Sequence, residues 1–325
     1  TAIGSGGKAV TGTGFKPDWV WIKNRDAADS HILTDVVRGV TKYISSNSTA
    51  AESTNTEALS TFDTDGFTVG NLDAVNTNTE NYVSWNWLAG GTGSSNTNGS
   101  INSTVTVANA GHLSIGTYTG TGANGTVGHG LTGAPEFVNV KQLNSTASWS
   151  ALIPAIGNSK AIFLNLSNAA QTVGASYWQN TDPTSTVFSV GTDNGVNALS
   201  STYVFQCFRS VPGVCKVGTY VGNLNANGPY IDIGFTPRFF LVKVTDGTNN
   251  WGIFDTARNT FNASNRTLNA NDATVEDTSY PLDILSNGVK IRGAFQFFND
   301  TGKTYLYMAM ADIGGNGTLP PIYGR

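Results

Sequence analysis

The sequence predicts an all-β protein built from tandem β-sandwich domains of the jelly-roll or lectin-like kind. Only 12% of its 325 residues are charged, about half of the roughly 25% that is usual in globular domains. Turn-forming and β-branched residues take their place, a composition typical of many short strands. A segment that occurs three times further predicts three internal repeats.

The repeated segment is a turn, a proline, an apolar run and a lysine. Its prolines are Pro17, Pro135 and Pro237, and the lysine follows each of them six residues later. A proline suits the start of a strand, where its missing N–H costs no hydrogen bond. The run after Pro17, residues 19–22, is apolar on both faces, which indicates a strand inside a sandwich or at an interface.

Other positions recur at fixed distances from these prolines. Trp149 and Trp251 lie fourteen residues after theirs, where the first copy has His31, and we interpret both tryptophans as core residues. A tyrosine opens a late apolar run in every copy: Tyr82, Tyr203 and Tyr305.

The opening strand is shared by only two copies. Residues 115–120 match residues 217–222, whereas the first copy lacks this strand. The first copy therefore starts short, or its strand comes from elsewhere.

A repeat of about 100 residues has the size of a domain, since solenoid units span only about 20–45 residues. We expect β-sandwich repeats at residues 1–90, 111–211 and 212–313. A flexible linker rich in Gly, Ser and Asn is expected at residues 91–110. Residues 314–325 are expected to form an irregular C-terminal tail.

The first and third copies share an aspartate followed by an arginine three residues later. These pairs are Asp35 with Arg38 and Asp255 with Arg258. One interpretation is a charged pair in a functional site. The other, which we favour, is a structural ion pair or turn cap that is used twice because the domain is duplicated.

Several function classes find no support in the sequence. The net charge is −4 and no basic run is present, which argues against nucleic-acid binding. No apolar run is long enough for a membrane helix. The three histidines lie at no ligand spacing, and no catalytic triad motif is present, so we expect no metal, cofactor or enzymatic activity. A carboxylate pair for glycoside hydrolysis is left open, because spatial pairs are invisible in a sequence.

Two cysteines are too few for a disulfide framework. Cys207 lies in an apolar run, and we interpret it as a small buried hydrophobic residue. Whether it pairs with Cys215 across the Pro212–Gly213 turn is left open.

One aromatic pair is a candidate for ligand binding. Tyr177 and Trp178 have no counterpart in the other copies and lie among polar residues. An exposed indole ring could stack on a sugar. The alternative is an edge aromatic or a subunit contact.

Several blocks of the sequence resemble a family of tailed-bacteriophage virion structural proteins, especially from aquatic phages. The blocks are residues 14–25, 35–39, 65–70, 82–85, 218–223, 251–259 and 285–288. The resemblance is to a poorly characterised domain associated with tail fibres or capsids. It implies location in the virion after assembly in the host cytoplasm, and it carries no catalytic residues. The second copy departs from the pattern, because it lacks the Asp-x-x-Arg element.

The function we expect is therefore that of a non-enzymatic virion protein, displayed as a tail fibre, tail appendage or capsid decoration. Its expected partners are other virion proteins and further copies of itself, as a trimer if it is a fibre. A host surface glycan is a further candidate partner. The alternative function is a carbohydrate-binding module or a surface-glycan depolymerase.

Overall fold

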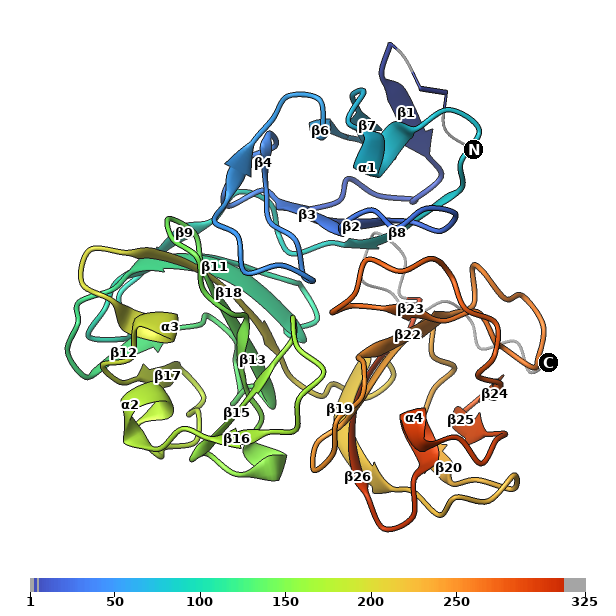
Figure 1. Cartoon of the computed structure of the whole chain (residues 1–325). Coiled ribbons are helices and arrows are strands. Elements are labelled where there is room, and N and C mark those ends of the chain that lie inside the picture. Colours follow the sequence, from blue (N-terminus) through green and yellow to red (C-terminus); the bar gives the residue numbers. More distant parts are fainter. Residues whose placement is uncertain (1–2, 5, 313–325) are drawn as a thin grey trace.

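Three β-sheets face a common centre, and each carries a second sheet on its outer side (Figure 1). The computed structural model describes residues 3–4 and 6–312. It is nearly all β, and every pairing between its named strands is antiparallel, which confirms the predicted all-β sandwich class. The jelly-roll or lectin-like type stays a prediction.

The first part, residues 3–90, contributes the sheet β3-β2-β8 to the centre and the sheet β1-β7-β6 to the outside. Its elements are β1 (Lys8–Thr11), β2 (Trp19–Asn24), β3 (Ile32–Asp35), β4 (Lys42–Tyr43), β5 (Ser53–Thr54), β6 (Leu59–Asp63), β7 (Gly66–Val69), α1 (Asp73–Asn76) and β8 (Tyr82–Trp87).

The second part, residues 91–211, contributes an eight-stranded sheet in the order β16-β15-β14-β13-β18-β11-β10-β9 and the outer pair β12-β17. Its elements are β9 (Ser94–Asn96), β10 (Ser103–Val107), β11 (Leu113–Thr119), β12 (Gly125–Gly128), β13 (Phe137–Gln142), β14 (Ser150–Leu152), the 3-10 turn η1 (Pro154–Ile156), β15 (Lys160–Phe163), β16 (Gln171–Thr172), α2 (Ala175–Trp178), β17 (Val187–Val190), α3 (Asn194–Asn197) and β18 (Thr202–Phe208).

The third part, residues 212–312, contributes the sheet β19-β26-β21-β22-β23 and the outer sheet β20-β25-β24. Its elements are β19 (Cys215–Val221), β20 (Tyr230–Asp232), β21 (Phe239–Val244), β22 (Gly252–Asp255), β23 (Leu268–Asn269), β24 (Leu282–Leu285), β25 (Gly288–Ile291), α4 (Gln296–Asn299) and β26 (Thr304–Met310).

The same strand order lies in each inner sheet. The strand that follows the proline is flanked by the next strand along the chain and by the last strand of its part: β3-β2-β8, β14-β13-β18 and β22-β21-β26. Within the described residues, two of these last strands have a further neighbour, since β11 pairs with β18 and β19 with β26. This order is what a triplicated domain would give, but the three internal repeats themselves stay a prediction.

Alternation along each inner strand builds two cores at once. In β2, Trp19 and Trp21 enter one core cluster, whereas Val20 and Ile22 enter another. The first of these, the shared core, also contains Trp149 and Trp251 and therefore draws on all three parts. The other clusters lie within single sandwiches. A strand with two apolar faces is required because both of its faces are buried.

The predicted flexible linker at residues 91–110 is wrong. This segment holds β9 and β10, and β10 pairs along its length with β11. Val105 and Ile101 are buried in the sandwich core of the second part. The alternation in Ser103–Val107 outweighs the Gly-, Ser- and Asn-rich composition, because the strand gains both a hydrogen-bonded neighbour and apolar burial.

The predicted tail, residues 314–325, lies outside the described residues. Within the described residues, no helix has the length and apolar character needed to cross a membrane.

Candidate functional site

The residue fourteen positions after each repeated proline makes a contact between two of the three parts. Trp149 and Trp251 are fully buried. The indole Nε1–H of Trp149 donates to the carbonyl oxygen of Ser45 in the first part, at 2.9 Å. That of Trp251 donates to the carbonyl oxygen of Phe163 in the second part, at 3.0 Å. Each tryptophan therefore joins its own part to the preceding one.

His31 takes the corresponding place in the first part and contacts the third. Its Nδ1 accepts a hydrogen bond from Trp21 Nε1 at 2.8 Å, so the proton of the neutral ring lies on Nε2. Nε2 then donates to the carbonyl oxygen of Asn269, at 2.9 Å. Burial, together with the charge of Lys23, lowers the pKa of His31 to about 3. The ring is therefore neutral at physiological pH.

A set of backbone hydrogen bonds follows the same cyclic order. The residues eight positions after the prolines are Arg25, Leu143 and Thr245. Their carbonyl oxygens accept from Glu276 N at 3.0 Å, from Glu52 N at 2.7 Å and from Ala170 N at 2.8 Å, respectively. The second part thus contacts the first, the third contacts the second, and the first contacts the third. The chain closes into a ring of three parts (Figure 1).

The two Asp-Arg pairs are buried and have the same geometry. Arg258 Nε lies 2.6 Å from Asp255 Oδ2, and its Nη2 donates to the carbonyl oxygen of Ile253 at 2.9 Å. Arg38 makes the same bonds to Asp35 and to Leu33. These contacts fit the interpretation as structural pairs and turn caps, since each aspartate also accepts two backbone N–H groups.

A glutamate completes each pair, but among the described contacts only one of the two glutamate side chains reaches across a junction. Glu52 lies 3.2 Å from Arg38 Nη1, within the first part. Glu276 lies 3.1 Å from Arg258 Nη1 in the third part. It also accepts two hydrogen bonds from Arg25 of the first part, at 2.8 and 2.9 Å. The junction that closes the ring therefore contains an ion pair.

The second part has isoleucines in place of the Asp-Arg pair. Ile153 and Ile156 lie at the same distances from Pro135 as Asp35 and Arg38 do from Pro17. Ile153 is fully buried in the shared core, and Ile156 packs against it. The departure of the second copy from the sequence pattern is therefore an exchange of a buried ion pair for apolar packing.

The repeated prolines and lysines mark the two ends of the inner strands. Pro17, Pro135 and Pro237 are buried, and each precedes its strand by two residues. The lysines at the far ends, Lys23, Lys141 and Lys243, are also buried, and each ammonium donates to the carbonyl oxygen of the next residue. Burial lowers the pKa of Lys243 to about 7 and those of Lys23 and Lys141 to about 8.

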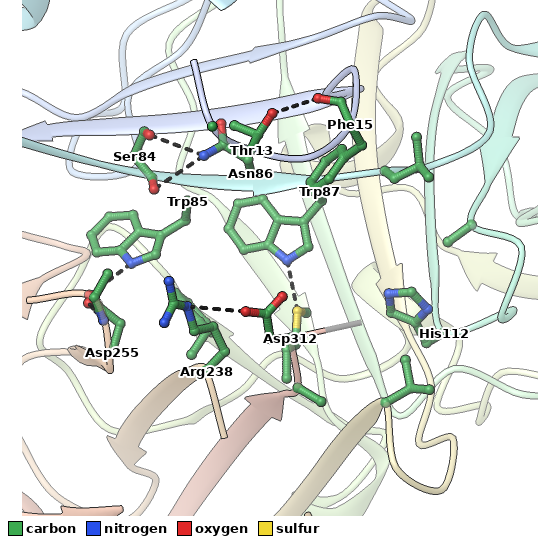
Figure 2. Close-up of a pocket in the computed structure, with 18 of the residues that line it drawn as sticks. Thr13, Phe15, Ser84, Trp85, Asn86, Trp87, His112, Arg238, Asp255 and Asp312 are labelled. Carbon is green, nitrogen blue, oxygen red and sulfur yellow. Dashed lines mark hydrogen bonds and ion pairs between the residues drawn. The ribbon is translucent and has the colours of Figure 1, made fainter. Parts of the chain in front are cut away.

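A cavity of about 350 Å³ lies beside β8, where all three parts meet. Trp85 and Trp87 point from β8 toward Arg238 and Asp312, whereas Ser84 lies on the other side of the strand (Figure 2). Trp87 Nε1 contacts Met310 Sδ at 2.8 Å. The wall that β8 forms opposite the third part therefore consists of two indole rings, which suit burial of apolar side chains.

Polar and charged side chains also line this cavity. Arg238 and Asp312 form an exposed ion pair at 3.8 Å. Burial, with a further effect from Arg209, lowers the pKa of His112 to about 4. Nδ1 of His112 has no hydrogen-bond partner among the described residues. Among the described lining residues, no serine or cysteine side chain donates to this histidine.

The prediction that Tyr177 and Trp178 bind a ligand is wrong for the indole ring. Trp178 is fully buried in the core of the second sandwich, and Tyr177 packs against that core. An indole with no exposed surface cannot stack on a sugar, so Trp178 is a core residue. The sequence misled because Ser176 and Asn180 on either side are exposed, whereas the indole itself is buried. Both cysteines are buried and unpaired, and burial raises the pKa of each thiol.

No cluster of three or more His, Cys, Asp or Glu side chains suited to a metal ion is present in the described part of the chain. A family model described as a domain of unknown function (DUF7483) matches residues 1–313. The chain belongs to the DUF7483 family. No curated protein and no solved structure matches it significantly. The fold and the contacts above are thus those of a DUF7483 member.

Proposed function

We propose that this DUF7483 protein is a non-enzymatic structural protein of a tailed-bacteriophage virion, displayed as a tail fibre, tail appendage or capsid decoration. The observation that carries the proposal is the closed ring, in which all three parts share one buried core. Such a body resists local opening, because no part can leave without exposing that core. The motif resemblance supplies the virion context.

The buried charged and titratable residues described above have structural roles in this ring. The Asp-Arg pairs cap turns, His31 bridges two parts, and the lysines satisfy carbonyl oxygens at strand ends. Perturbed pKa values accompany structural ion-pair and hydrogen-bond networks as well as active sites. A rigid body of this kind serves a particle that must persist outside the cell, with other virion proteins and further copies of the chain as its partners.

Averaged electron density of purified phage particles tests the proposal. Density for the ring at the tail or on the capsid shell, absent from particles of a mutant that lacks the gene, is the expected result. Density at the tail tip would favour contact with a host surface glycan, and density on the shell would favour decoration. Particles that never contain the chain would overturn the proposal.

A further inference from the structure

The outer edge of β8 differs from the two edges that correspond to it. β18 lies between β13 and β11, and β26 lies between β21 and β19. β8 pairs with β2, and within the described residues it ends its sheet. A strand edge with unpaired N–H and C=O groups is a template for another strand. The 350 Å³ cavity lies along this edge.

The three last strands correspond residue by residue, because their first tyrosines make the same contacts. The hydroxyl of Tyr82 donates to Asp73 O at 2.6 Å, that of Tyr203 to Asn194 O at 2.6 Å, and that of Tyr305 to Gln296 O at 2.8 Å. Each acceptor lies nine residues earlier in the chain, in the short helix that precedes the strand. Tyr82 therefore corresponds to Tyr203 and Tyr305.

In the second and third parts, the neighbouring strand brings a second tyrosine to this position. Tyr118 of β11 stacks on Tyr203, and Tyr220 of β19 stacks on Tyr305, both with ring centroids 5.0 Å apart. The hydroxyl of Tyr220 donates to the carbonyl oxygen of Phe298 at 2.6 Å, and that of Tyr118 donates to the carbonyl oxygen of Val196. Both acceptors lie seven residues before the stacked tyrosine.

The first part has a cavity where this second tyrosine would lie. A cavity of about 160 Å³ is lined by Val10, Phe67, Val69, Val75 and Tyr82, among others. Val75 lies seven residues before Tyr82 and so corresponds to Val196 and Phe298. An apolar cavity of about 150 Å³ can hold a benzene ring. The space therefore suits the ring of one tyrosine stacked on Tyr82.

The same backbone hydrogen bond occurs in all three parts just after the position of the opening strand, and it locates this tyrosine in the sequence. The backbone N–H groups of Ile3, Thr121 and Asn223 donate to asparagine Oδ1 atoms at 3.0, 2.8 and 2.9 Å. All three donors lie fourteen residues before their prolines. Tyr118 and Tyr220 lie three residues before their donors. The corresponding position is the one directly in front of Thr1.

We propose that the edge of β8 binds an extended segment that leads directly into Thr1, pairs antiparallel with Tyr82–Trp87 and stacks a tyrosine on Tyr82. Apolar side chains three and five positions before that tyrosine would enter the cavity beside Trp85 and Trp87. The corresponding residues of β11, Ile115 and Leu113, enter the shared core. The segment thus completes both the first sandwich and the shared core.

One detail separates the proposed strand from its two counterparts. A Cβ at Gly116 would lie 2.4 Å from the ring of Phe205, and one at Gly218 would lie 2.6 Å from the hydroxyl of Tyr307. The corresponding residue of β8 is Ser84, a far smaller side chain. The strand that binds β8 therefore does not need glycine at this position.

The test copies residues 113–118, which end in a tyrosine, directly in front of Thr1. The matched control carries the same six residues with one glycine inserted before Thr1, because a slip of one residue turns every side chain to the opposite face. We expect hydrogen exchange of the edge amides of β8 to slow at least tenfold in the first variant and the thermal midpoint to rise. The slipped variant should behave like the parent chain.

Equal exchange rates in both extended variants and the parent would overturn the proposal. So would a free peptide of residues 113–118 that protects β8 as well as the attached copy does at equal concentration, since the occupant would then be a strand from a separate chain. A further variant that places serine at the tyrosine position of the extension should lose most of the rise in the midpoint, because the 160 Å³ cavity stays unfilled.

Discussion

The junction that closes the ring differs from the two junctions between consecutive parts. Trp149 and Trp251 join the consecutive parts through buried indoles that donate to carbonyl oxygens. The closing junction uses His31, the Arg25–Glu276 ion pair and a hydrogen bond from Trp85 Nε1 to Asp255, at 3.0 Å. Packing of indoles depends little on pH or salt, whereas histidine and ion pairs respond to both. The ring is therefore most sensitive to pH and salt at the junction where the first and third parts meet.

The largest effect is expected from removing the arginine beside the closing junction. In Arg258→Met, the buried carboxylate of Asp255 loses its charged partner, and Glu276 loses one of its own. Breaking a buried pair in this way costs about 3–5 kcal/mol. Urea unfolding of the variant should show this loss in the free energy of unfolding.

The control for this variant is Arg266→Met. Arg266 contacts the same glutamate at 3.0 Å, but its side chain is 42% exposed, so the loss should stay below about 1 kcal/mol. Equal losses in the two variants would contradict the role assigned to burial.

A smaller loss is expected when a consecutive junction loses its indole donor. Trp251→Phe keeps an aromatic ring but leaves the buried carbonyl oxygen of Phe163 without that N–H donor. The oxygen keeps a second donor, Leu166 N at 3.1 Å, so the lost hydrogen bond and the smaller ring together cost about 1–3 kcal/mol. Trp149→Phe should give a loss of similar size, and neither loss should change between pH 4 and pH 7. A strong pH dependence of either loss would contradict the assignment of pH sensitivity to the closing junction.

Acid should weaken the closing junction before the other two. The pKa of His31 is lowered to about 3 in the folded chain, against an ordinary value of about 6.5. The unfolded chain therefore takes up a proton below pH 6.5 that the folded chain does not, and stability falls as pH drops from about 6.5 toward 3.

Exchange of indole N–H protons, followed by NMR, checks this order. The N–H of Trp21, which is bonded to His31 Nδ1, should exchange progressively faster between pH 6.5 and pH 4 once intrinsic rates are corrected. The N–H of Trp251, whose acceptor is a carbonyl oxygen, is the internal control and should change little. His31→Gln should reduce the slope of stability against pH, and an unchanged slope would count against the assignment.

The smallest effect is expected from the ion pair that crosses the closing junction. Arg25→Met removes the 2.8 Å pair with Glu276, and the Arg25 side chain is 20% exposed. We expect a loss of about 1 kcal/mol at low salt, and the loss should shrink in 1 M NaCl, where charges are screened. Arg238→Met, which removes an exposed pair at 3.8 Å, should have no measurable effect. A loss in Arg25→Met that is unchanged by salt would show that packing, and not charge, is responsible.

Much of the local structure could be predicted from the sequence. The two apolar faces of residues 19–22 indicated a strand buried on both sides, and Trp19 and Val20 do enter different cores. The Asp-x-x-Arg element indicated structural pairs because it recurs in two copies, and the aspartate of the third copy does cap a turn and meet the arginine. The sequence also indicated that the first copy lacks the opening strand of the other two. It did not indicate the edge of β8 and the cavities that lie beside it.

Local composition misled at two places where packing against other strands decides burial. The segment at residues 91–110 has the composition of a linker, yet β10 finds a partner in β11. Trp178 lies among polar residues, yet its ring lies in a core built from strands far away in the chain. The adjacent strand β11 and the core of the second sandwich decided the first outcome, whereas strands distant in sequence decided the second.

By itself, the sequence determined the class of the fold and the three copies of the proline-to-lysine segment, because strand periodicity and turn chemistry are local. Only the tertiary structure decided that the three parts close into a ring and that the residue fourteen positions after each proline contacts the neighbouring part. It also decided that β8 ends its sheet within the described residues, with two cavities beside it. The physical reason is that ring closure rests on single hydrogen bonds and packed indoles between residues far apart in the chain. Their geometry exists only once all three sheets share one core.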